Sequence, residues 1–264
     1  MAEFSGKVAV VAGGARGIGL AAARKLAIEG ASVVICSDRE DQVEEAVAEL
    51  REEGLEVSGT RADVTSSADM KRLMDFATET YGGVDVLVNS AGIQRYGTVV
   101  ETEVEVWDEV LNVNLKGIYL ASRYAIPEMR KRGGGAIVNL SSVQAFASQT
   151  GVAAYTASKG GINALTRAMA LDHAEENIRV NAVCPASVDT PMLRWSADQL
   201  EGEKSVEETV ADWGRMHPVG RVAKPEEVAE VIAFLASDRA SFVTGGDYKV
   251  DGGMLAALGV RLPE

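Results

Sequence analysis

VAVVAGGARGIG, residues 8–19, joins a short apolar run to the start of a helical pattern through a glycine-rich turn. The run Val8–Ala12 is rich in valine and lacks polar alternation, which is typical of a strand covered on both faces of a parallel sheet. Glycines at the turn let backbone N–H groups approach a phosphate at the positive end of the following helix. The spacing, Gly-x-x-x-Gly-x-Gly, differs from the more common Gly-x-Gly-x-x-Gly. The stretch predicts the start of a dinucleotide-binding βαβ unit, with a tight turn that binds nothing as the alternative.

The rest of the chain repeats this alternation of apolar run and amphipathic segment. Strict alternation favours an α/β fold: one domain over residues 1–264 with a doubly wound parallel sheet (Rossmann), about seven strands and helices on both faces. Strands are expected at Val8–Ala12, Ser32–Cys36, Glu56–Gly59, Asp85–Val88, Ala136–Leu140, Arg179–Val183 and Phe242–Val250. Helices are expected at about Gly17–Glu29, Asp41–Glu53, Ser67–Tyr81, Val104–Lys131, Val152–Glu175 and Pro225–Ala236.

The amino-acid composition argues against two classes of binding partner, nucleic acid and membrane. The 264 residues carry a formal net charge of -13. Such an acidic surface repels nucleic acid and anionic membrane, so we expect neither as a partner. No run approaches the ~20 apolar residues of a membrane span, and the N-terminus lacks the pattern of a signal peptide.

The cysteines and histidines indicate a cytoplasmic protein without a metal. Cys36 and Cys184 each end an apolar run and lie far from any second cysteine in the sequence. Buried free thiols in a reducing cytoplasm are the simplest explanation. His173 and His217 lack metal-ligand spacing, so no metal site is expected.

Acidic residues after the second and third strands bear on the choice of cofactor. Asp38 follows the glycine turn by about 20 residues, where an acid can accept hydrogen bonds from an adenosine ribose. It would repel a 2′-phosphate by about 1–4 kcal/mol, which favours NAD. Arg16 and Arg39 could instead bind that phosphate, so NADP stays open, as does a plain loop role for Asp38. Asp63 could accept from the adenine amino group or serve as an N-cap or turn residue.

Tyr155 and Lys159 lie four residues apart, on one face of a predicted helix. A cation about 4 Å from the phenol would supply about 3–4 kcal/mol, enough to lower a tyrosine pKa by about 2–3 units. The pair could then give and take a proton near neutral pH. Ser142, at the end of the fifth strand, would be a second hydrogen-bond donor to a developing alkoxide. Alone, the Tyr–Lys spacing is equally typical of an ordinary surface pair.

Taken together and in order, the motifs resemble those of the short-chain dehydrogenase/reductase family over essentially the whole chain. Each motif is common by itself, whereas the ordered set is specific. The set comprises Gly13–Gly19, Asn89-Ser90-Ala91-Gly92, Asn114, Ser142, Tyr155 with Lys159, Cys184-Pro185 followed by Val188-Asp189-Thr190-Pro191, and Asp251-Gly252-Gly253.

The resemblance implies roles for these residues. Tyr155 would be the general acid/base, and Lys159 would hold the nicotinamide ribose and lower the Tyr155 pKa. Ser142 would orient the substrate oxygen, and Asn114 would support a water-mediated proton relay through Lys159. The residues implied to bind the cofactor are Gly13, Arg16, Gly17, Ile18, Gly19, Asp38, Asp63, Val64, Asn89, Ala91, Gly92, Tyr155, Lys159, Pro185, Val188 and Thr190, the last two at the carboxamide. Family members are commonly homotetramers or homodimers, joined through the two longest helices and the C-terminal strand, and we expect one of these here.

Four positions depart from the family pattern. Ala12 replaces the usual Thr, Ser90 an Asn or Ala, and Ala186 a Gly. Ser37 occupies the position where NAD-preferring members often carry Asp, with Asp38 one place later.

Residues 186–224 show weak periodicity and predict a substrate-binding lid at the carboxyl edge of the sheet. Gln94, Gln144, Gln149 and Trp195 are candidate substrate contacts. Glutamines facing the pocket would favour a hydroxylated substrate, although loop glutamines are commonly just solvated. Packing of the segment's Trp and Met side chains on the body or on a partner subunit is the alternative.

We therefore expect an NAD(P)-dependent oxidoreductase that transfers a hydride between nicotinamide and a secondary alcohol or ketone. A sugar, polyol or other hydroxylated small molecule is the expected substrate. An NADPH-dependent 3-oxoacyl thioester reductase is the nearest alternative, and a non-catalytic dinucleotide sensor is an alternative of another class. A nucleotide-sugar epimerase would need an added substrate domain.

Overall fold

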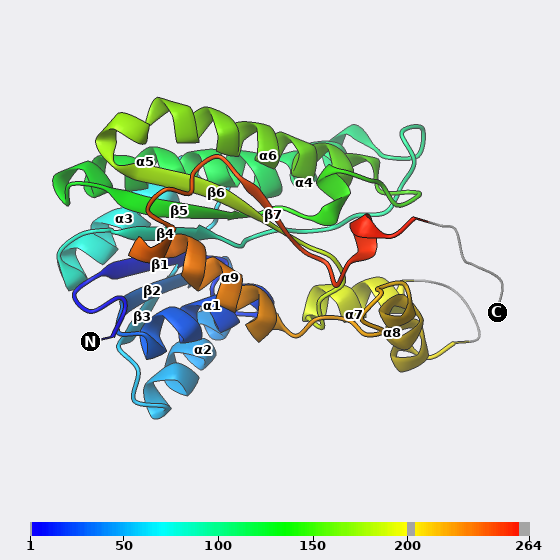
Figure 1. Ribbon diagram of the computed structural model, residues 1–264, viewed down its shortest axis with the longest axis horizontal. Coiled ribbons are helices and arrows are strands. Elements are labelled where there is room, and N and C mark those ends of the chain that lie inside the picture. The colour runs from blue at the N-terminus through cyan, green and yellow to red at the C-terminus, as the bar shows by residue number, and fades with distance from the viewer. Residues whose placement is uncertain (1, 200–203, 259–264) are drawn as a thin grey trace.

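The computed structural model describes residues 2–199 and 204–258 of the chain (Figure 1). Its centre is one sheet of seven parallel strands in the order β3-β2-β1-β4-β5-β6-β7. The predicted doubly wound fold is confirmed. The order reverses between β1 and β4, so the crevice outside their carboxyl ends is where such a sheet binds ligands. The strands are β1 (Val8–Ala12), β2 (Ser32–Ser37), β3 (Val57–Arg61), β4 (Val86–Asn89), β5 (Gly135–Leu140), β6 (Ile178–Pro185) and β7 (Asp247–Val250).

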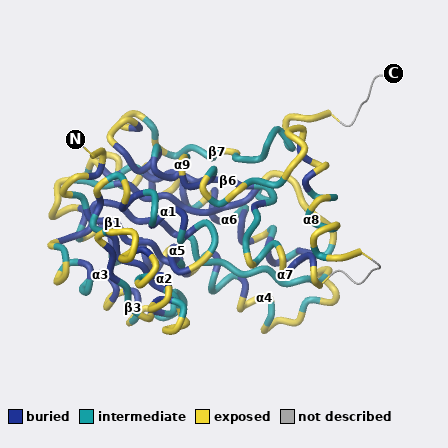
Figure 2. Tube along the Cα trace, turned by 90° about the horizontal axis from the view of Figure 1, so that it is seen from below, coloured by how far each residue is buried: buried dark blue, intermediate teal, exposed yellow. Residues whose placement is uncertain are grey.

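Helices cover both faces of the sheet (Figure 1). On one face lie α1 (Gly17–Ile28), α2 (Glu40–Glu52) and α9 (Pro225–Ala236), and on the other α3 (Ser67–Tyr81), α5 (Gly117–Lys131) and α6 (Ala153–Asp172). Each layer buries its own apolar cluster against the sheet, and Figure 2 shows the buried strands running through the middle of the molecule. Val and Ile without polar alternation in β1 and β2 follow from this two-sided burial.

The last predicted strand is wrong in its first half. The sequence predicts an extended chain over Phe242–Val250, but β7 begins only at Asp247. Gly245 has a φ of +76°, a conformation that bends the chain away from a strand, and Phe242 before it is fully exposed at 102%. Other strand ends shift by one or two residues: β3 runs from Val57 to Arg61 and β6 extends to Pro185.

The predicted helix Val104–Lys131 is interrupted. It consists of α4 (Val104–Leu111), a π-helical turn at Asn112–Lys116 and α5. Asn114, in the π turn, is completely buried. Turns of this kind often mark functional sites, which directs attention to this side chain.

The weakly periodic segment 186–224 contains two short helices that the sequence analysis missed. They are α7 (Pro191–Asp198) and α8 (Val206–Arg215), and positions 200–203 of the predicted lid lie outside the described residues. Side-chain caps define their starts: the Thr190 hydroxyl accepts from Leu193 N, and Ser205 forms a capping box with Glu208. Helices of two to three turns give little periodicity to detect. Across the described part of the chain, no helix has the length and apolarity needed to cross a membrane.

Candidate active site

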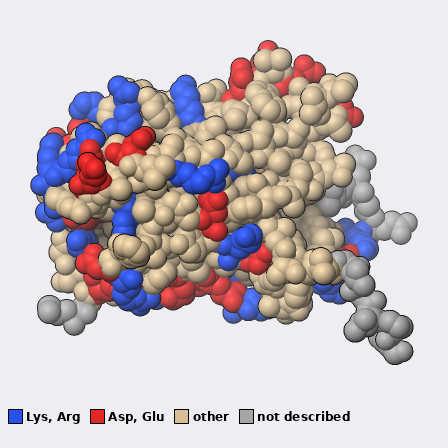
Figure 3. All heavy atoms as spheres, turned by 45° about the horizontal axis from the view of Figure 1, so that its top comes forward, with Lys and Arg blue, Asp and Glu red and all other residues tan. Residues whose placement is uncertain are grey.

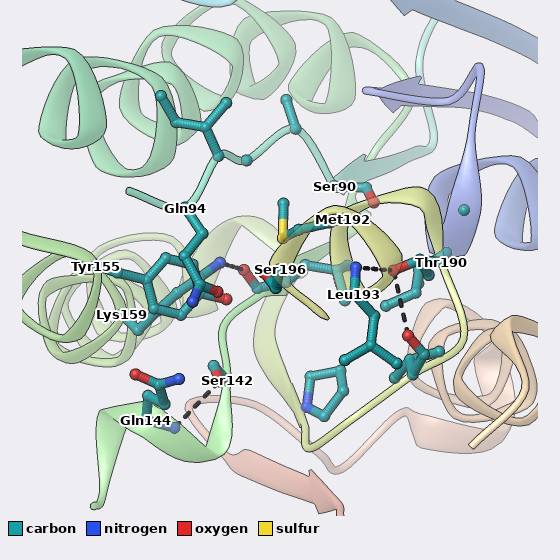
Figure 4. Close-up of a pocket in the computed structure, with 18 of the residues that line it drawn as sticks. Ser90, Gln94, Ser142, Gln144, Tyr155, Lys159, Thr190, Met192, Leu193 and Ser196 are labelled. Atoms are coloured by element: carbon teal, nitrogen blue, oxygen red, sulfur yellow. Dashed lines mark hydrogen bonds between the residues drawn. The ribbon is translucent and has the colours of Figure 1, made fainter. Parts of the chain in front are cut away.

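A cleft of about 920 Å³ opens at the carboxyl ends of the strands, where the order of the sheet reverses. The glycine turn, the ends of β2, β4, β5 and β6, the first turns of α6, and α7 and α8 all contribute to it. Its volume lies within the range of cofactor and small-molecule sites. Figure 4 shows Gln94, Tyr155, Lys159, Ser142 and Gln144 converging on one part of it, with Thr190, Met192 and Leu193 on the other.

The glycine turn is shaped for close approach. A Cβ added at Gly13 would lie 2.5 Å from Ala91 N, and one at Gly19 would lie 2.0 Å from Gly13 O. No side chain of the described residues caps α1 and its first turn holds no acid. The N–H groups at this helix end are therefore left for an external acceptor, and they border the cleft at Gly17 and Ile18. The turn fits a dinucleotide pyrophosphate.

The end of β2 carries the expected acid. Asp38 and Ser37 both line the cleft, and the Ser37 hydroxyl donates to Asp38 Oδ1 at 3.2 Å. The guanidinium of the neighbouring Arg39 is already engaged in an ion pair. It forms two bonds to the Asp41 carboxylate (Nη2–Oδ2 2.9 Å, Nε–Oδ1 3.2 Å). Arg16 lines the cleft near the glycine turn.

Asp63 has the turn role considered for it. Its Oδ1 accepts from both the N–H and the hydroxyl of Thr65 at 2.8 Å, so the side chain organises the turn after β3. Asp63 and Val64 nevertheless line the cleft.

Ser142, Tyr155 and Lys159 meet on one wall of the cleft, and all three are buried. The Ser142 hydroxyl accepts from Gln144 N at 3.1 Å, which leaves its hydrogen free to donate into the cleft. Lys159 Nζ donates to the Leu140 carbonyl at 2.8 Å and lies 5.3 Å from the centre of the Tyr155 ring. The set expected from the sequence is thus assembled from the end of β5 and the start of α6.

The electrostatics of this set differ from the expectation. Burial raises the pKa of Tyr155 to about 12, with the Ser142 hydroxyl acting in the opposite direction. Burial also lowers the pKa of Lys159 to about 8. The predicted lowering of the Tyr155 pKa by Lys159 is therefore not found, because desolvation dominates and the ammonium faces the ring while bonded to Leu140.

Asn114 lies behind this wall and does not line the cleft. Its Oδ1 accepts from Ile93 N at 2.8 Å, and its Nδ2 donates to Ile93 O at 3.0 Å and to Ser158 Oγ at 3.1 Å. Ser158 in turn donates to the Tyr155 carbonyl at 2.6 Å. One buried amide therefore ties the loop after β4 to the turn of α6 that carries Tyr155.

Three other predicted site residues also lie outside the cleft. Asn89 donates to Asn139 Oδ1 at 2.9 Å, between neighbouring strands, and Gly19 is packed against the glycine turn. Trp195 stacks on Tyr96, with ring centres 6.1 Å apart, and so braces α7 against the loop after β4. The remaining predicted residues line the cleft, including Gln94, Gln144 and Gln149.

The cleft also contains residues that the sequence analysis did not predict as site residues. Arg95 and Glu109 line it and form a bidentate pair (Nη2–Oε1 2.8 Å, Nε–Oε2 3.1 Å). A sequence pattern could not reveal this pair, since it joins a loop to α4.

Three methionines line the cleft: Met192 of α7, Met216 after α8, and Met254 near the C-terminus. Met254 and Leu255 are held there by Asp251, whose carboxylate accepts from Gly253 N and Leu255 N, both at 3.0 Å. In the sequence, the motif Asp251-Gly252-Gly253 was the feature that could have indicated the part of the cleft wall formed by Met254 and Leu255. Within residues 2–199 and 204–258, no cluster of three His, Cys, Asp or Glu side chains is arranged to hold a metal ion.

Comparison with known proteins places this geometry among dehydrogenases. Residues 13–255 match a family model described as enoyl-(acyl carrier protein) reductase. Human dehydrogenase/reductase SDR family member 4 is 38% identical over 256 residues, covering 97% of this chain and 90% of its own. Cis-4-hydroxycyclohexanecarboxylate dehydrogenase of Sinomonas cyclohexanicum is 41% identical over 254 residues, covering 96% and 98%. The structure of aldohexose dehydrogenase from Thermoplasma acidophilum superposes with a TM-score of 0.91 at 38% identity, covering 100% and 99%.

Proposed function

Because this chain belongs to the short-chain dehydrogenase/reductase family of oxidoreductases, which act on CH–OH groups with NAD(P), we propose that it transfers a hydride between nicotinamide and a secondary alcohol or ketone. One observation carries the proposal. Ser142, Tyr155 and Lys159 line the same continuous cleft as the glycine turn Gly13–Ile18. The bound dinucleotide would supply the hydride acceptor or donor.

In this proposal each side chain of the site has a separate role in the reaction. Ser142 donates a hydrogen bond to the substrate oxygen, and Tyr155 exchanges the proton of that oxygen. Lys159 holds the nicotinamide ribose, and once a bound cofactor favours its charged form it would stabilise the phenolate. Asn114 supports Tyr155 and Lys159 from behind by fixing the start of α6. Pro185, Val188 and Thr190, at the end of β6, hold the nicotinamide end.

We propose NAD as the cofactor. Asp38 lines the cleft where an adenosine ribose would lie, and Arg39 is held by Asp41. A 2′-phosphate would meet a carboxylate there without a free guanidinium from Arg39 to offset it.

We propose that residues 186–224 form the substrate lid, with positions 200–203 outside the described residues. Support comes from α7 and α8, since Met192, Leu193 and Ser196 of the first helix and Trp213 of the second line the cleft. Met216 just beyond α8 is 62% exposed although it borders the cleft, as expected of a residue that a substrate would cover.

The proposed substrate is an uncharged hydroxylated small molecule, such as a sugar, a polyol or a cyclic alcohol. Gln94, Gln144 and Gln149 offer polar contacts and the methionines an apolar wall. Glu109 pairs with the guanidinium of Arg95, so this guanidinium is not available to bind a carboxylate of the substrate. Two relatives are named for small hydroxylated substrates, an aldohexose and cis-4-hydroxycyclohexanecarboxylate, the second of which also carries a carboxylate.

A 3-oxoacyl thioester reductase is the second candidate, because the description of the matched family model names an acyl carrier protein substrate, although for reduction of an enoyl group. An acidic carrier protein would need a basic docking patch, and Arg130-Lys131-Arg132 is the cluster to consider. Each of its cations is already paired, with Glu176, Glu128 and Asp85 respectively. This argues against carrier docking there.

For the oligomeric state and the cellular compartment, we propose what is common in the family. A homotetramer or homodimer is proposed, because Tyr119 of α5, Leu171 of α6 and Phe242 before β7 are exposed apolar residues. Figure 3 shows a face on which a broad uncharged area adjoins a region of mixed charge. The buried free thiols Cys36 and Cys184 support a reducing, cytoplasmic setting.

A direct test is titration with NADH and NADPH by fluorescence, followed by an alcohol panel with the tighter cofactor. The panel includes glucose, a polyol, cyclohexanol and a 3-hydroxyacyl thioester. Turnover of uncharged alcohols with NAD supports the proposal. Turnover of the thioester alone, with NADP, supports the second candidate, and dinucleotide binding without any turnover supports a sensor.

A further inference from the structure

His217 is a buried residue just behind the cleft that the proposed reaction does not use. It is 4% exposed and lies in the turn after α8. Its main chain shapes this turn, donating to Gly214 O at 3.1 Å and accepting from Gly220 N at 2.8 Å. His217 itself does not line the cleft, whereas its neighbours Trp213 and Met216 do.

Two backbone groups from different segments hold its imidazole ring. Nδ1 lies 2.9 Å from the Trp213 carbonyl, which can only accept, so Nδ1 carries a hydrogen and donates it. Ser187 N donates to Nε2 at 3.3 Å, so Nε2 is the acceptor. Only the tautomer with hydrogen on Nδ1 satisfies both partners, which makes the ring a defined connector between them.

The bond to Ser187 leads to the nicotinamide end of the cleft. The Ser187 carbonyl accepts from Ala223 N at 2.9 Å, and Asp189 N donates to Ala223 O at 2.9 Å. Between these anchors lies Val188, whose carbonyl accepts from the Thr190 hydroxyl at 3.2 Å. His217 thus fixes the first backbone N–H of the segment that carries Val188 and Thr190.

The bond to Trp213 leads to the opposite, substrate-binding wall. Trp213 belongs to the last turn of α8, and its carbonyl also accepts from Met216 N at 3.1 Å. The ring therefore reinforces the helix end from which the Trp213 and Met216 side chains reach the cleft.

We propose that His217 is a positioning residue that sets the distance between the nicotinamide-binding segment 187–190 and the substrate wall of α8. This inference rests on the proposed function for the identity of the two ligands. The imidazole touches neither of them and acts through two backbone bonds, one to each wall.

Two substitutions separate the two bonds. His217→Asn places an amide near the Nδ1 position and keeps the donor to Trp213, whereas His217→Gln reaches the Nε2 position and keeps the acceptor for Ser187. Loss of one such bond corresponds to about a 2- to 10-fold change in affinity. His217→Asn should raise the dissociation constant for NADH by this factor with KM for the alcohol nearly unchanged. His217→Gln should raise KM for the alcohol by this factor and leave the dissociation constant for NADH nearly unchanged.

The matched control is His173, the other of the chain's two histidines. It bonds to Glu176 at 3.0 Å beyond the end of α6, and His173→Asn and His173→Gln should change neither quantity. The opposite split between the two His217 variants, a parallel change in both quantities, or no change in either would each overturn the proposal.

A spectroscopic measurement on the unaltered protein does not depend on the variants folding or on finding a substrate. In protein carrying ¹⁵N-labelled histidine, the His217 resonances should report a protonated Nδ1 and an unprotonated Nε2, with His173→Gln used to assign them. The opposite tautomer would refute the proposal. If no alcohol is turned over, the proposed function fails, while this measurement and the NADH titration still decide the role of His217.

Discussion

Lys159 Nζ donates to the carbonyl of Leu140 at 2.8 Å, so the last residue of β5 anchors the buried cation of the candidate site. The ammonium keeps two further N–H donors, and it lies beside the Tyr155 ring at 5.3 Å. Desolvation of each group dominates in the unliganded chain, which explains the raised pKa of Tyr155 and the lowered pKa of Lys159. A ligand that accepts from Lys159 would stabilise its charged form.

Tyr155→Phe should abolish turnover while dinucleotide binding is retained. The substitution removes only the hydroxyl that exchanges the proton, and general acid–base groups contribute about 10²–10⁴-fold to rates. Turnover of the preferred alcohol and NADH titration are the two measurements. A variant that keeps near wild-type turnover contradicts the assigned role of Tyr155.

The buried charge of Lys159 should be visible in the pH dependence of stability. Its pKa is about 8 when folded against 10.5 for the ordinary group, so between these values the unfolded state binds more protons and stability rises with pH. The rise attributable to Lys159 is at most about 3 kcal/mol. The measurement is the free energy of unfolding in denaturant, for the ligand-free wild type and for Lys159→Met, from pH 7 to pH 10.5. The difference between the two free energies should change by this amount across that range. Lys131→Met, at an exposed position, is the control; an equal pH dependence in wild type and Lys159→Met would disprove the burial argument.

Asp38→Ala should shift cofactor preference toward NADP. The carboxylate beside the proposed ribose site would repel a 2′-phosphate by about 1–4 kcal/mol, so the ratio of NADPH to NADH affinity should rise by about 10-fold or more. Asp41→Asn should add to this by releasing Arg39 from its bidentate pair. Fluorescence titrations of the single and double variants test both. An unchanged ratio in Asp38→Ala would show that the acid lies away from the ribose.

Glu109→Gln should improve the use of hydroxy acids. The carboxylate of Glu109 occupies the Arg95 guanidinium, and its removal leaves a cationic fork facing the cleft. We expect kcat/KM for 4-hydroxycyclohexanecarboxylate to rise by about 10-fold relative to cyclohexanol. Glu105→Gln, on the same helix, is the matched control. If the wild type already prefers the acid and Arg95→Gln abolishes that preference, the uncharged-substrate proposal is wrong.

The sequence could predict the parts of the fold and site that local pattern determines. Uniformly apolar strands, the glycine turn at residues 13–19, and the Tyr155–Lys159 spacing on one helical face all follow from chemistry within a few residues. The π turn at Asn114 was not predicted; the local signal for it is an asparagine inside a helical pattern, where that residue is intrinsically unfavourable. The extent of β7 was overestimated, because Gly245 bends the chain at the turn signal Gly245-Gly246 and the strand begins only after it, at Asp247.

Features that depend on distant contacts could not be predicted in this way. The Arg95–Glu109 pair joins two segments whose approach is set by tertiary packing. The wall formed by Met254 and Leu255 depends on how the chain after β7 folds back through Asp251. Likewise, the direction of the Tyr155 pKa depends on burial, which the spacing of Tyr155 and Lys159 does not report.

Met192, Met216 and Met254 all line the cleft and make its apolar lining sensitive to peroxide. Conversion to sulfoxides would turn an apolar wall polar while leaving the glycine turn at residues 13–19 chemically unchanged. Mild oxidation should therefore weaken alcohol binding before NADH binding, and methionine sulfoxide reductase should restore it.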